Sequence, residues 1–306
     1  MNAIEIKDLR KYYDETKAVD GISLSVHRGE VFGMLGPNGA GKTTTVEIVE
    51  GLRVADSGDV TVLGMDVRKE AAKIKARIGV QLQTTSLYPL LTVREIIDLF
   101  RSFYPGPTND TEYVIDAVNL REKEKTRSQN LSGGQQQRLS MALALVNKPD
   151  IIFLDEPTTG LDPQARRKIW DVIQQVSDVG TTVFLTTHYM EEAQRLCDRV
   201  AVIDYGRIIA LNTPDELIST HFEESAIEFD LNGGSVDLEW LSGLTGVTNV
   251  RQDGRAITLY SENVPQTLGE LTDLGRSRHL TLDDLHVRRA TLEDVFLKLT
   301  GRRIRE

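Results

Sequence analysis

A glycine-rich loop between a short apolar run and a helix-forming segment carries the clearest chemical signal in the sequence. The apolar run, residues 31–35, is typical of a buried strand, and residues 45–50 are typical of the start of a helix. Glycines in such a loop let backbone N–H groups turn toward a bound phosphate, and the helix N-terminus adds partial positive charge. The loop therefore predicts a binding site for a nucleoside triphosphate. Its residues are Gly36, Pro37, Asn38, Gly39, Ala40, Gly41, Lys42, Thr43 and Thr44.

Two side chains of this loop have the chemistry that a triphosphate requires. The Lys42 ammonium can reach the β- and γ-phosphates, and the Thr43 hydroxyl can coordinate Mg²⁺. The alternative is a glycine turn followed by a chance lysine, which does not account for the complete spacing between strand and helix. We therefore expect Lys42 to serve both in binding and in catalysis.

Two adjacent carboxylates, Asp155 and Glu156, follow a second apolar run at residues 151–154. A continuous apolar run suits a buried parallel strand. Two carboxylates at the end of such a strand indicate a site that binds a metal ion or transfers a proton. We expect Asp155 to hold Mg²⁺ through its shell and Glu156 to orient or deprotonate the attacking water. The alternative is a pair of exposed loop acids, against which the upstream phosphate loop argues.

A second helix start with the features of a phosphate site lies at residues 131–135. Ser132 is well placed as N-cap, and Gly133 and Gly134, followed by Gln135, leave backbone N–H groups of the first turn exposed. Each glycine costs the helix about 1 kcal/mol relative to alanine. A close approach of the backbone to an anion explains that cost, so we predict a second phosphate-binding helix start.

Two further candidates stand at the ends of predicted strands. His188 follows residues 181–187, a β-branched and apolar run typical of a core strand, and ligands of open α/β sheets bind at the carboxyl ends of strands. A lone histidine is usually structural, so the functional interpretation rests on this position. Gln83 ends the strand predicted over residues 78–83, where its side-chain amide could reach Mg²⁺ or water.

Composition bounds the classes of protein to which the chain can belong. Its 306 residues, 40% hydrophobic and 27% charged, predict a globular protein of two domains. A net charge of −10 argues against a nucleic-acid-binding surface. The single cysteine, Cys197, excludes an internal disulfide and is expected in the core of a protein from a reducing compartment. No run approaches the roughly 18 apolar residues of a membrane span, and none is typical of a signal peptide. Action at a membrane would therefore require a separate membrane partner.

The elements expected to position these residues alternate between strand and helix patterns. Tyr12 and Tyr13 follow the first strand, and either could stack on an adenine ring or simply pack at the strand end. Thr92 opens a helix with a capping box, Asp162 caps another that Pro163 begins, and residues 121–127 are expected to be a solvated charge run. Strands are expected over 3–9, 18–26, 59–63, 78–83, 151–154 and 181–187, a turn over 54–58, a hairpin over 200–204 and 207–210, and helices over 70–77, 111–118, 163–179, 191–196 and 215–218.

Taken together, these motifs resemble the ATP-binding subunit of an ABC transporter over residues 1–220. Many ATPases share the phosphate loop and the run ending in Asp155-Glu156, whereas the segment 131–135, hereafter the signature, and His188 are specific to this family. The resemblance implies an α/β fold of the P-loop NTPase cassette type. Such a cassette has a mixed sheet core, an antiparallel β subdomain and a helical subdomain, here at residues 85–148.

The resemblance also implies roles for individual residues. Tyr13, rather than Tyr12, matches the aromatic that stacks on adenine, and Gln83 matches the glutamine that links the nucleotide site to the membrane subunit. The turn 160–162 adds Asp162 to the ATP-binding residues. Because Glu156 is present, the site is expected to hydrolyse ATP. The residues that match the contacts to a γ-phosphate bound by the other subunit are Ser132, Gly134 and Gln135.

The two phosphate-binding helix starts predict a dimer. In one chain they cannot both easily face one triphosphate, whereas in a head-to-tail pair each ATP lies between residues 36–44 of one subunit and residues 132–135 of the other. The resemblance implies a homodimer, or a heterodimer with a second cassette, attached from the cytoplasm to the inner face of the membrane through a separate transmembrane permease. ATP and Mg²⁺ are the expected cofactors, and no nucleic acid is expected.

Residues 221–306 are expected to form a small α+β accessory domain without a catalytic constellation. Strands over 226–231, 256–260 and 285–289, a helix over 264–274 and a final helix capped at Thr291 indicate this class. Residues 290–301 are similar to the C-terminal extension of drug-export ATPases of the daunorubicin-resistance type, which suggests an exporter and a regulatory or dimer-stabilising role for this domain.

Two other functions remain as alternatives at this point. A soluble ATPase of the same superfamily acting on ribosomes or DNA usually has two cassettes or a long coiled-coil insertion, and neither pattern is present here. The net negative charge of the chain also argues against an ATPase that acts on ribosomes or DNA. A non-enzymatic ATP-sensing module is opposed by Glu156 and His188.

Overall fold

The computed structural model describes residues 1–82, 86–221, 225–232, 238–278 and 281–301. Over these described residues the chain divides into two compact units, 1–214 and 215–301. Within the described residues, no helix combines the length and the apolarity needed to cross a membrane.

The first unit is built around a six-stranded sheet with strand order β10-β9-β3-β8-β7-β6. β10 runs antiparallel to β9, and every other pair is parallel. β3, β7 and β8 are buried at every residue, as expected of continuous apolar and β-branched runs. Because these three strands are neighbours, the residues that follow them meet at one edge of the sheet. The strands are β3 (Val31–Leu35), β6 (Ile78–Gln81), β7 (Ile151–Asp155), β8 (Thr182–Thr187), β9 (Arg199–Asp204) and β10 (Arg207–Asn212).

Cys197 lies in this core, as predicted. Its side chain is buried, and it packs so closely against β3 that a Cβ placed on Gly33 would stand 2.6 Å from its Sγ. Burial raises the pKa of the Cys197 thiol well above its usual value. The residue is therefore a small core side chain rather than a reactive one.

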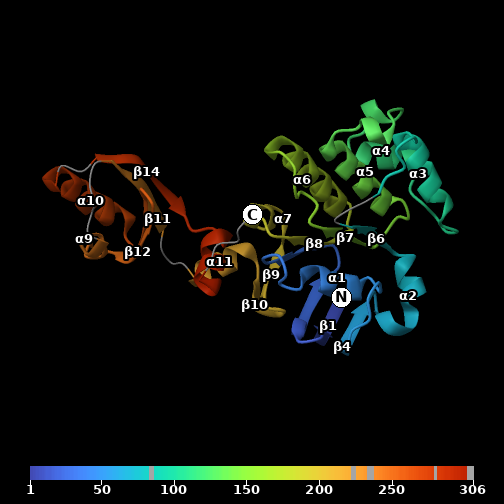
Figure 1. Ribbon diagram of the computed structural model, residues 1–306, viewed down its shortest axis with the longest axis horizontal. Helices are drawn as coiled ribbons and strands as arrows, with labels where there is room; N and C mark the ends of the chain where they lie inside the picture. Colours follow the sequence, from blue (N-terminus) through green and yellow to red (C-terminus); the bar gives the residue numbers. More distant parts are fainter. Residues whose placement is uncertain (83–85, 222–224, 233–237, 279–280, 302–306) are drawn as a thin grey trace. The chain divides into compact units, whose positions relative to one another are not determined.

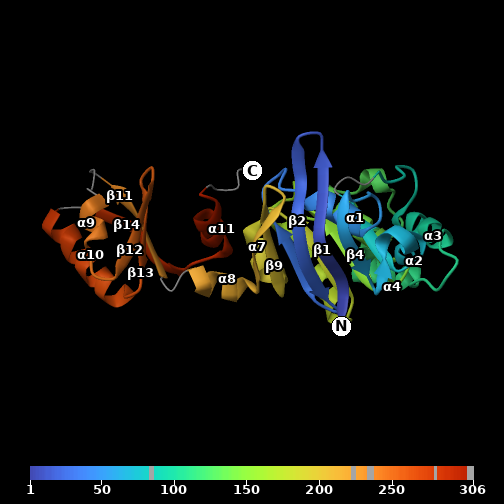
Figure 2. The same ribbon diagram turned by 90° about the horizontal axis from the view of Figure 1, so that it is seen from below.

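An antiparallel sheet of order β2-β1-β4-β5 packs against this core from one side, and Figure 2 shows the long β1–β2 hairpin. The predicted first strand ended too early, because a bulge at Asp8 (φ +45°) interrupts the alternation and pairing then resumes through Tyr13. The turn predicted over 54–58 also extends too far, because its last two residues belong to β4. Gly58 lies in β4, where a Cβ would be 2.4 Å from the Asp8 carbonyl oxygen. The strands are β1 (Asn2–Tyr13), β2 (Thr16–His27), β4 (Ser57–Val62) and β5 (Met65–Asp66).

Helices cover both faces of the six-stranded sheet. In Figure 1, α3 to α6 lie on one side of it, and α1, α2 and the antiparallel sheet lie on the other. The predicted capping box at Thr92 is confirmed, since its backbone N–H donates to Glu95 Oε2 at 2.8 Å and its hydroxyl accepts from the Glu95 N–H. The helices are α1 (Lys42–Val49), α2 (Val67–Lys75), α3 (Val93–Ser102), α4 (Thr111–Ala117), α5 (Gly133–Leu145), α6 (Pro163–Asp178) and α7 (Met190–Leu196).

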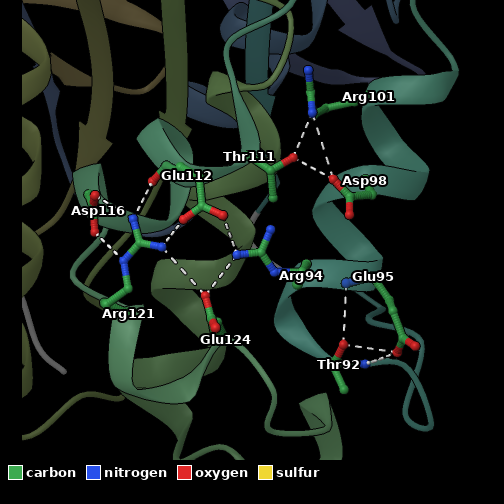
Figure 3. Close-up of polar contacts among 10 residues, drawn as sticks. All are labelled: Thr92, Arg94, Glu95, Asp98, Arg101, Thr111, Glu112, Asp116, Arg121 and Glu124. Atoms are coloured by element: carbon green, nitrogen blue, oxygen red, sulfur yellow. Dashed lines mark hydrogen bonds and ion pairs between the residues drawn. The ribbon is translucent and has the colours of Figure 1, made fainter.

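An ion-pair network joins α3, α4 and the segment after α4 (Figure 3). Arg94 contacts Glu112 and lies 2.8 Å from Glu124, while Arg121 contacts Glu112 and Asp116. Residues 121–127 are mostly exposed, as predicted for a solvated charge run, and two of them, Arg121 and Glu124, also form ion pairs. Each pair is partly exposed and individually weak, but the shared partners tie the helices together.

The second unit contains an antiparallel sheet of order β12-β13-β11-β14 with helices against it. Its core consists of Ile227, Phe229, Leu231, Leu241, Ile257, Leu259 and Leu271. β12 and α9 were not predicted, because β12 is mostly exposed and lacks clean alternation and α9 is a single short turn. The capping box at Thr291 is confirmed, and the final helix ends at Gly301 with φ +71°. The elements are α8 (Pro214–His221), β11 (Ser225–Asn232), α9 (Leu238–Ser242), β12 (Val247–Asp253), β13 (Ala256–Ser261), α10 (Val264–Arg278), β14 (Thr281–Arg289) and α11 (Leu292–Thr300).

Candidate nucleotide-binding and hydrolysis site

The loop between β3 and α1 has a backbone path that only glycine permits at two positions. Gly41 has φ +102°, and a Cβ there would stand 2.1 Å from the Ala18 carbonyl oxygen. A Cβ on Gly36 would stand 2.3 Å from the Ile203 carbonyl oxygen. Gly39 (φ +81°) instead faces open space, with nothing within 4 Å of a Cβ. The loop is thus fixed by contacts on its inner side and open on its outer side, as a phosphate-binding loop requires.

A pocket of about 380 Å³ lies over this loop. Tyr13 stands on its wall with 37% of its surface exposed. The Tyr12 hydroxyl, by contrast, donates to Asp20 Oδ1 at 2.9 Å, and Tyr12 does not line the pocket. The geometry therefore places one of the two tyrosines beside the loop. The lining residues are Tyr13, Ala18, Asn38, Gly39, Gly41, Lys42, Thr43, Thr44 and Glu156.

The Lys42 ammonium is held at the floor of the pocket. It donates to the carbonyl oxygens of Gly36 at 2.8 Å and Pro37 at 3.1 Å, and its Nζ lies 3.2 Å from Glu156 Oε1. Burial lowers the pKa of Lys42, while the Glu156 carboxylate opposes that shift. The loop therefore presents a fixed, largely desolvated cation to the pocket.

Asp155 stands where two hydroxyl groups meet. Thr43 Oγ1 donates to Asp155 Oδ2 at 3.2 Å, and the Thr186 hydroxyl donates to Oδ1. Burial raises the pKa of Asp155, and these two donors act against it. A carboxylate and a hydroxyl are hard oxygen ligands, which fit Mg²⁺ in the usual arrangement with phosphate oxygens and waters. Among the described residues, no cluster of three or more His, Cys, Asp or Glu residues is suited to a metal ion.

Glu156 adopts a backbone conformation rare for its type. Its φ is +48°, and its N–H donates to the carbonyl and the hydroxyl oxygens of Thr186, each at 3.1 Å. Such conformations persist where surrounding contacts fix them, and they cluster at functional sites. Here the backbone places the carboxylate at the edge of the sheet, facing the pocket.

The Glu156 carboxylate lies between a cation and an imidazole. Oε1 is near Lys42, while Oε2 accepts from the Thr159 hydroxyl at 3.1 Å and lies 3.2 Å from His188 Nδ1. The His188 contact is a close approach rather than a well-aligned hydrogen bond. His188 first, and then Lys42, hold the pKa of Glu156 at about 2 in spite of its burial. The carboxylate is therefore ionised at neutral pH.

Sequence reasoning missed Thr159 and Thr186, which fix the Glu156 side chain and backbone. Thr159 lies in the polar turn after the carboxylates, and Thr186 lies inside a β-branched run, where a threonine is ordinary for a strand. The role of Thr186 depends on pairing between β7 and β8, which no local pattern reveals, whereas Thr159 reaches Glu156 from only three residues away.

The signature begins α5 and stands apart from the pocket. Ser132 is the N-cap, its N–H donates to Gln135 Oε1 at 2.9 Å, and no residue of 132–135 lines the pocket. A Cβ on Gly134 would stand 2.9 Å from Ala165 Cβ in α6, so helix packing also requires glycine there. Gly133 has nothing within 4 Å of a Cβ and leaves its backbone open to a ligand.

Asp162 is a further candidate, and its role in this chain is to cap a helix. The Asp162 carboxylate accepts from the Ala165 N–H at 2.8 Å, which confirms it as the N-cap of α6. Asp162 does not line the pocket. Gln83 lies outside the described residues.

Comparisons with known proteins agree with this geometry. A family model described as "ABC transporter" matches residues 19–159. The linearmycin resistance ATP-binding protein of Bacillus subtilis is 36% identical over 99% of this chain and 100% of its own length. A daunorubicin resistance ATP-binding protein of Streptomyces coeruleorubidus is 38% identical over 99% and 98%. A dimeric ATP-binding cassette, solved in a post-hydrolysis state with ADP and Pi, is 28% identical over 69% of this chain and 98% of that chain, with a TM-score of 0.62.

Proposed function

The chain belongs to the ATP-binding subunits of ABC transporters, and on that premise we propose that it is the ATP-hydrolysing motor of an exporter. The observation that carries the proposal is the ionised Glu156 held beside Lys42 and His188 over the phosphate loop. Relatives that match nearly the whole chain are named for resistance to linearmycin and daunorubicin, which favours export of a drug-like cargo. They do not favour the alternative of a soluble ATPase acting on ribosomes or DNA.

The residues in and beside the pocket take separate parts in ATP and Mg²⁺ binding. Tyr13 stacks on the adenine, the loop N–H groups surround the phosphates, and Lys42 binds the β- and γ-phosphates. Thr43 and Asp155 hold Mg²⁺, which supplies charge neutralisation of the phosphates when bound. Gln83, which lies outside the described residues, is proposed as a further Mg²⁺ contact.

Glu156 orients the attacking water and accepts its proton. A carboxylate with a pKa of about 2 is a weak base. Lys42 contributes to that low pKa, and a γ-phosphate competes with Glu156 for the Lys42 ammonium. Substrate binding therefore raises the pKa of Glu156 toward a value better suited to a base. His188 remains beside Glu156 and keeps the carboxylate oriented.

The active form is proposed to be a dimer attached to a permease. The signature residues 132–135 do not line the pocket of their own chain, and the backbone at Gly133 is open. The signature is therefore available to a γ-phosphate bound by a second copy of the chain. Asp162 caps α6 beside the same helix start and belongs to this surface. ATP binding then closes the dimer and hydrolysis opens it. A separate transmembrane permease, to which the dimer attaches at the cytoplasmic face of the membrane, uses this motion.

Replacement of Glu156 by glutamine tests the proposal. Glu156→Gln preserves the shape of the side chain but removes the basic carboxylate, so ATP should bind with wild-type affinity while turnover falls by at least about 10²-fold. Phosphate release and equilibrium binding of a fluorescent ATP analogue measure the two quantities. Turnover that survives the substitution would show that Glu156 is not the base.

A further inference from the structure

A second buried carboxylate, Glu192, lies close to the site but outside the pocket. It belongs to α7, the helix that follows His188, and its side chain is fully buried. Its Oε1 accepts from the Thr158 hydroxyl and from Trp170 Nε1, each at 2.9 Å. One oxygen atom thus joins three segments that are distant in the sequence.

The two donors come from segments that carry proposed site residues. Thr158 is fully buried and follows Glu156 by two residues, in the loop that leads to Asp162. Trp170 lies on α6, the helix that Asp162 caps. Glu192 therefore connects the backbone that carries Glu156, the helix behind Asp162 and the helix that follows His188.

A carboxylate in this place is costly for the fold. Removing it from water is unfavourable, burial raises the pKa of Glu192, and its Oε2 has no hydrogen-bond partner among the described residues. An apolar side chain of similar volume would fill the same space without that cost, provided that the Thr158 and Trp170 donors were also replaced. Packing alone does not explain the residue, whereas a fixed acceptor shared by three segments around the proposed catalytic site does.

We propose that Glu192 is a positioning residue: it holds the loop after Glu156 against α6 and α7, and so fixes the position of the Glu156 carboxylate relative to His188. The inference rests on the proposed ATPase function. Glu192 touches neither nucleotide nor water in this proposal and acts through the side chains that its carboxylate contacts, including Thr158 and Trp170. Loss of the acceptor should therefore affect the chemical step and leave ATP binding by the phosphate loop unchanged.

The test compares Glu192→Ala and Glu192→Gln in the full-length chain. The alanine variant should lower kcat at least about tenfold with KM for ATP within about twofold of wild type, because small misplacements of a catalytic group have large effects on rate. The glutamine variant retains an acceptor oxygen for both donors and should recover most of kcat. Glu191→Ala removes an exposed carboxylate from the same helix and should match wild type.

Thr158→Val provides a second route if Glu192→Ala does not fold, since it removes one donor and should lower kcat with KM again unchanged. The thermal midpoint of each variant is measured so that rates are compared on folded protein. Wild-type kcat in Glu192→Ala or in Thr158→Val would overturn the inference, as would a glutamine variant as slow as the alanine variant. If the wild type hydrolyses ATP and Glu156→Gln does not, the proposed function stands whichever result Glu192 gives.

Discussion

Replacement of Gly41 by alanine tests whether the phosphate loop is fixed by contact with the β1–β2 hairpin. At Gly41 the new Cβ would stand 2.1 Å from the Ala18 carbonyl oxygen and would also sit at φ +102°. Left-handed backbone costs an L-residue about 1–2 kcal/mol, and forcing extra volume into a packed site costs about 1–3 kcal/mol more. We therefore expect Gly41→Ala to lower the free energy of unfolding by about 2–5 kcal/mol.

Gly39→Ala is the matched control, because it has φ +81° and nothing within 4 Å of a Cβ. It should show only the backbone cost of about 1–2 kcal/mol. Urea unfolding of the nucleotide-free protein, followed by far-UV circular dichroism, measures both variants. If the two lose the same stability, the clash is relieved without cost, and the loop is not held by Ala18 as described.

The other two predictions concern the adenine contact and the charge of Glu156. Tyr13→Ala should raise the Kd for ATP about tenfold, because one base–aromatic stack contributes about 1–3 kcal/mol. Tyr12→Phe should leave the Kd unchanged, because the Tyr12 hydroxyl bonds Asp20 away from the pocket. ATP titration of both variants measures the two Kd values, and equal effects would contradict the assignment of Tyr13 to the adenine. The pKa of Glu156 is depressed from 4.5 to about 2, so its ionised form contributes stability that is present above pH 4.5 and is lost as the pH falls toward 2. Acid unfolding should therefore be less steep over this range in Glu156→Gln, and identical profiles would contradict the ion-pair assignment.

The elements whose signal is local could be predicted from the sequence. β3 and β7 were recognised as continuous apolar runs, and the helix starts at Thr92, Ser132 and Asp162 were recognised from their capping residues. These features depend on a few neighbouring residues, so pattern and propensity suffice. The order of motifs along the chain then sufficed to predict that Lys42 and Glu156 share one site.

Features that depend on contacts between distant segments could not be predicted. The positive φ of Glu156 is fixed by Thr186 on a neighbouring strand, and Gly58 lies in a strand because it packs against the bulge at Asp8. Glu192 has the sequence context of an ordinary helix-surface acid, yet Thr158 and Trp170 enclose it. Burial of a polar side chain is a property of the assembled fold, and periodicity does not report it.

The mass of Glu156→Gln in solution, with and without ATP, tests most directly whether ATP is bound between two copies of the chain. We expect a monomer without nucleotide and a dimer with ATP, because the phosphate loop of each copy and the signature of the other are proposed to enclose the same γ-phosphate. Adding Ser132→Arg should return the protein to a monomer while each copy still binds ATP. A strictly monomeric ATP-loaded Glu156→Gln protein at high concentration, or a dimer indifferent to Ser132→Arg, would contradict the account.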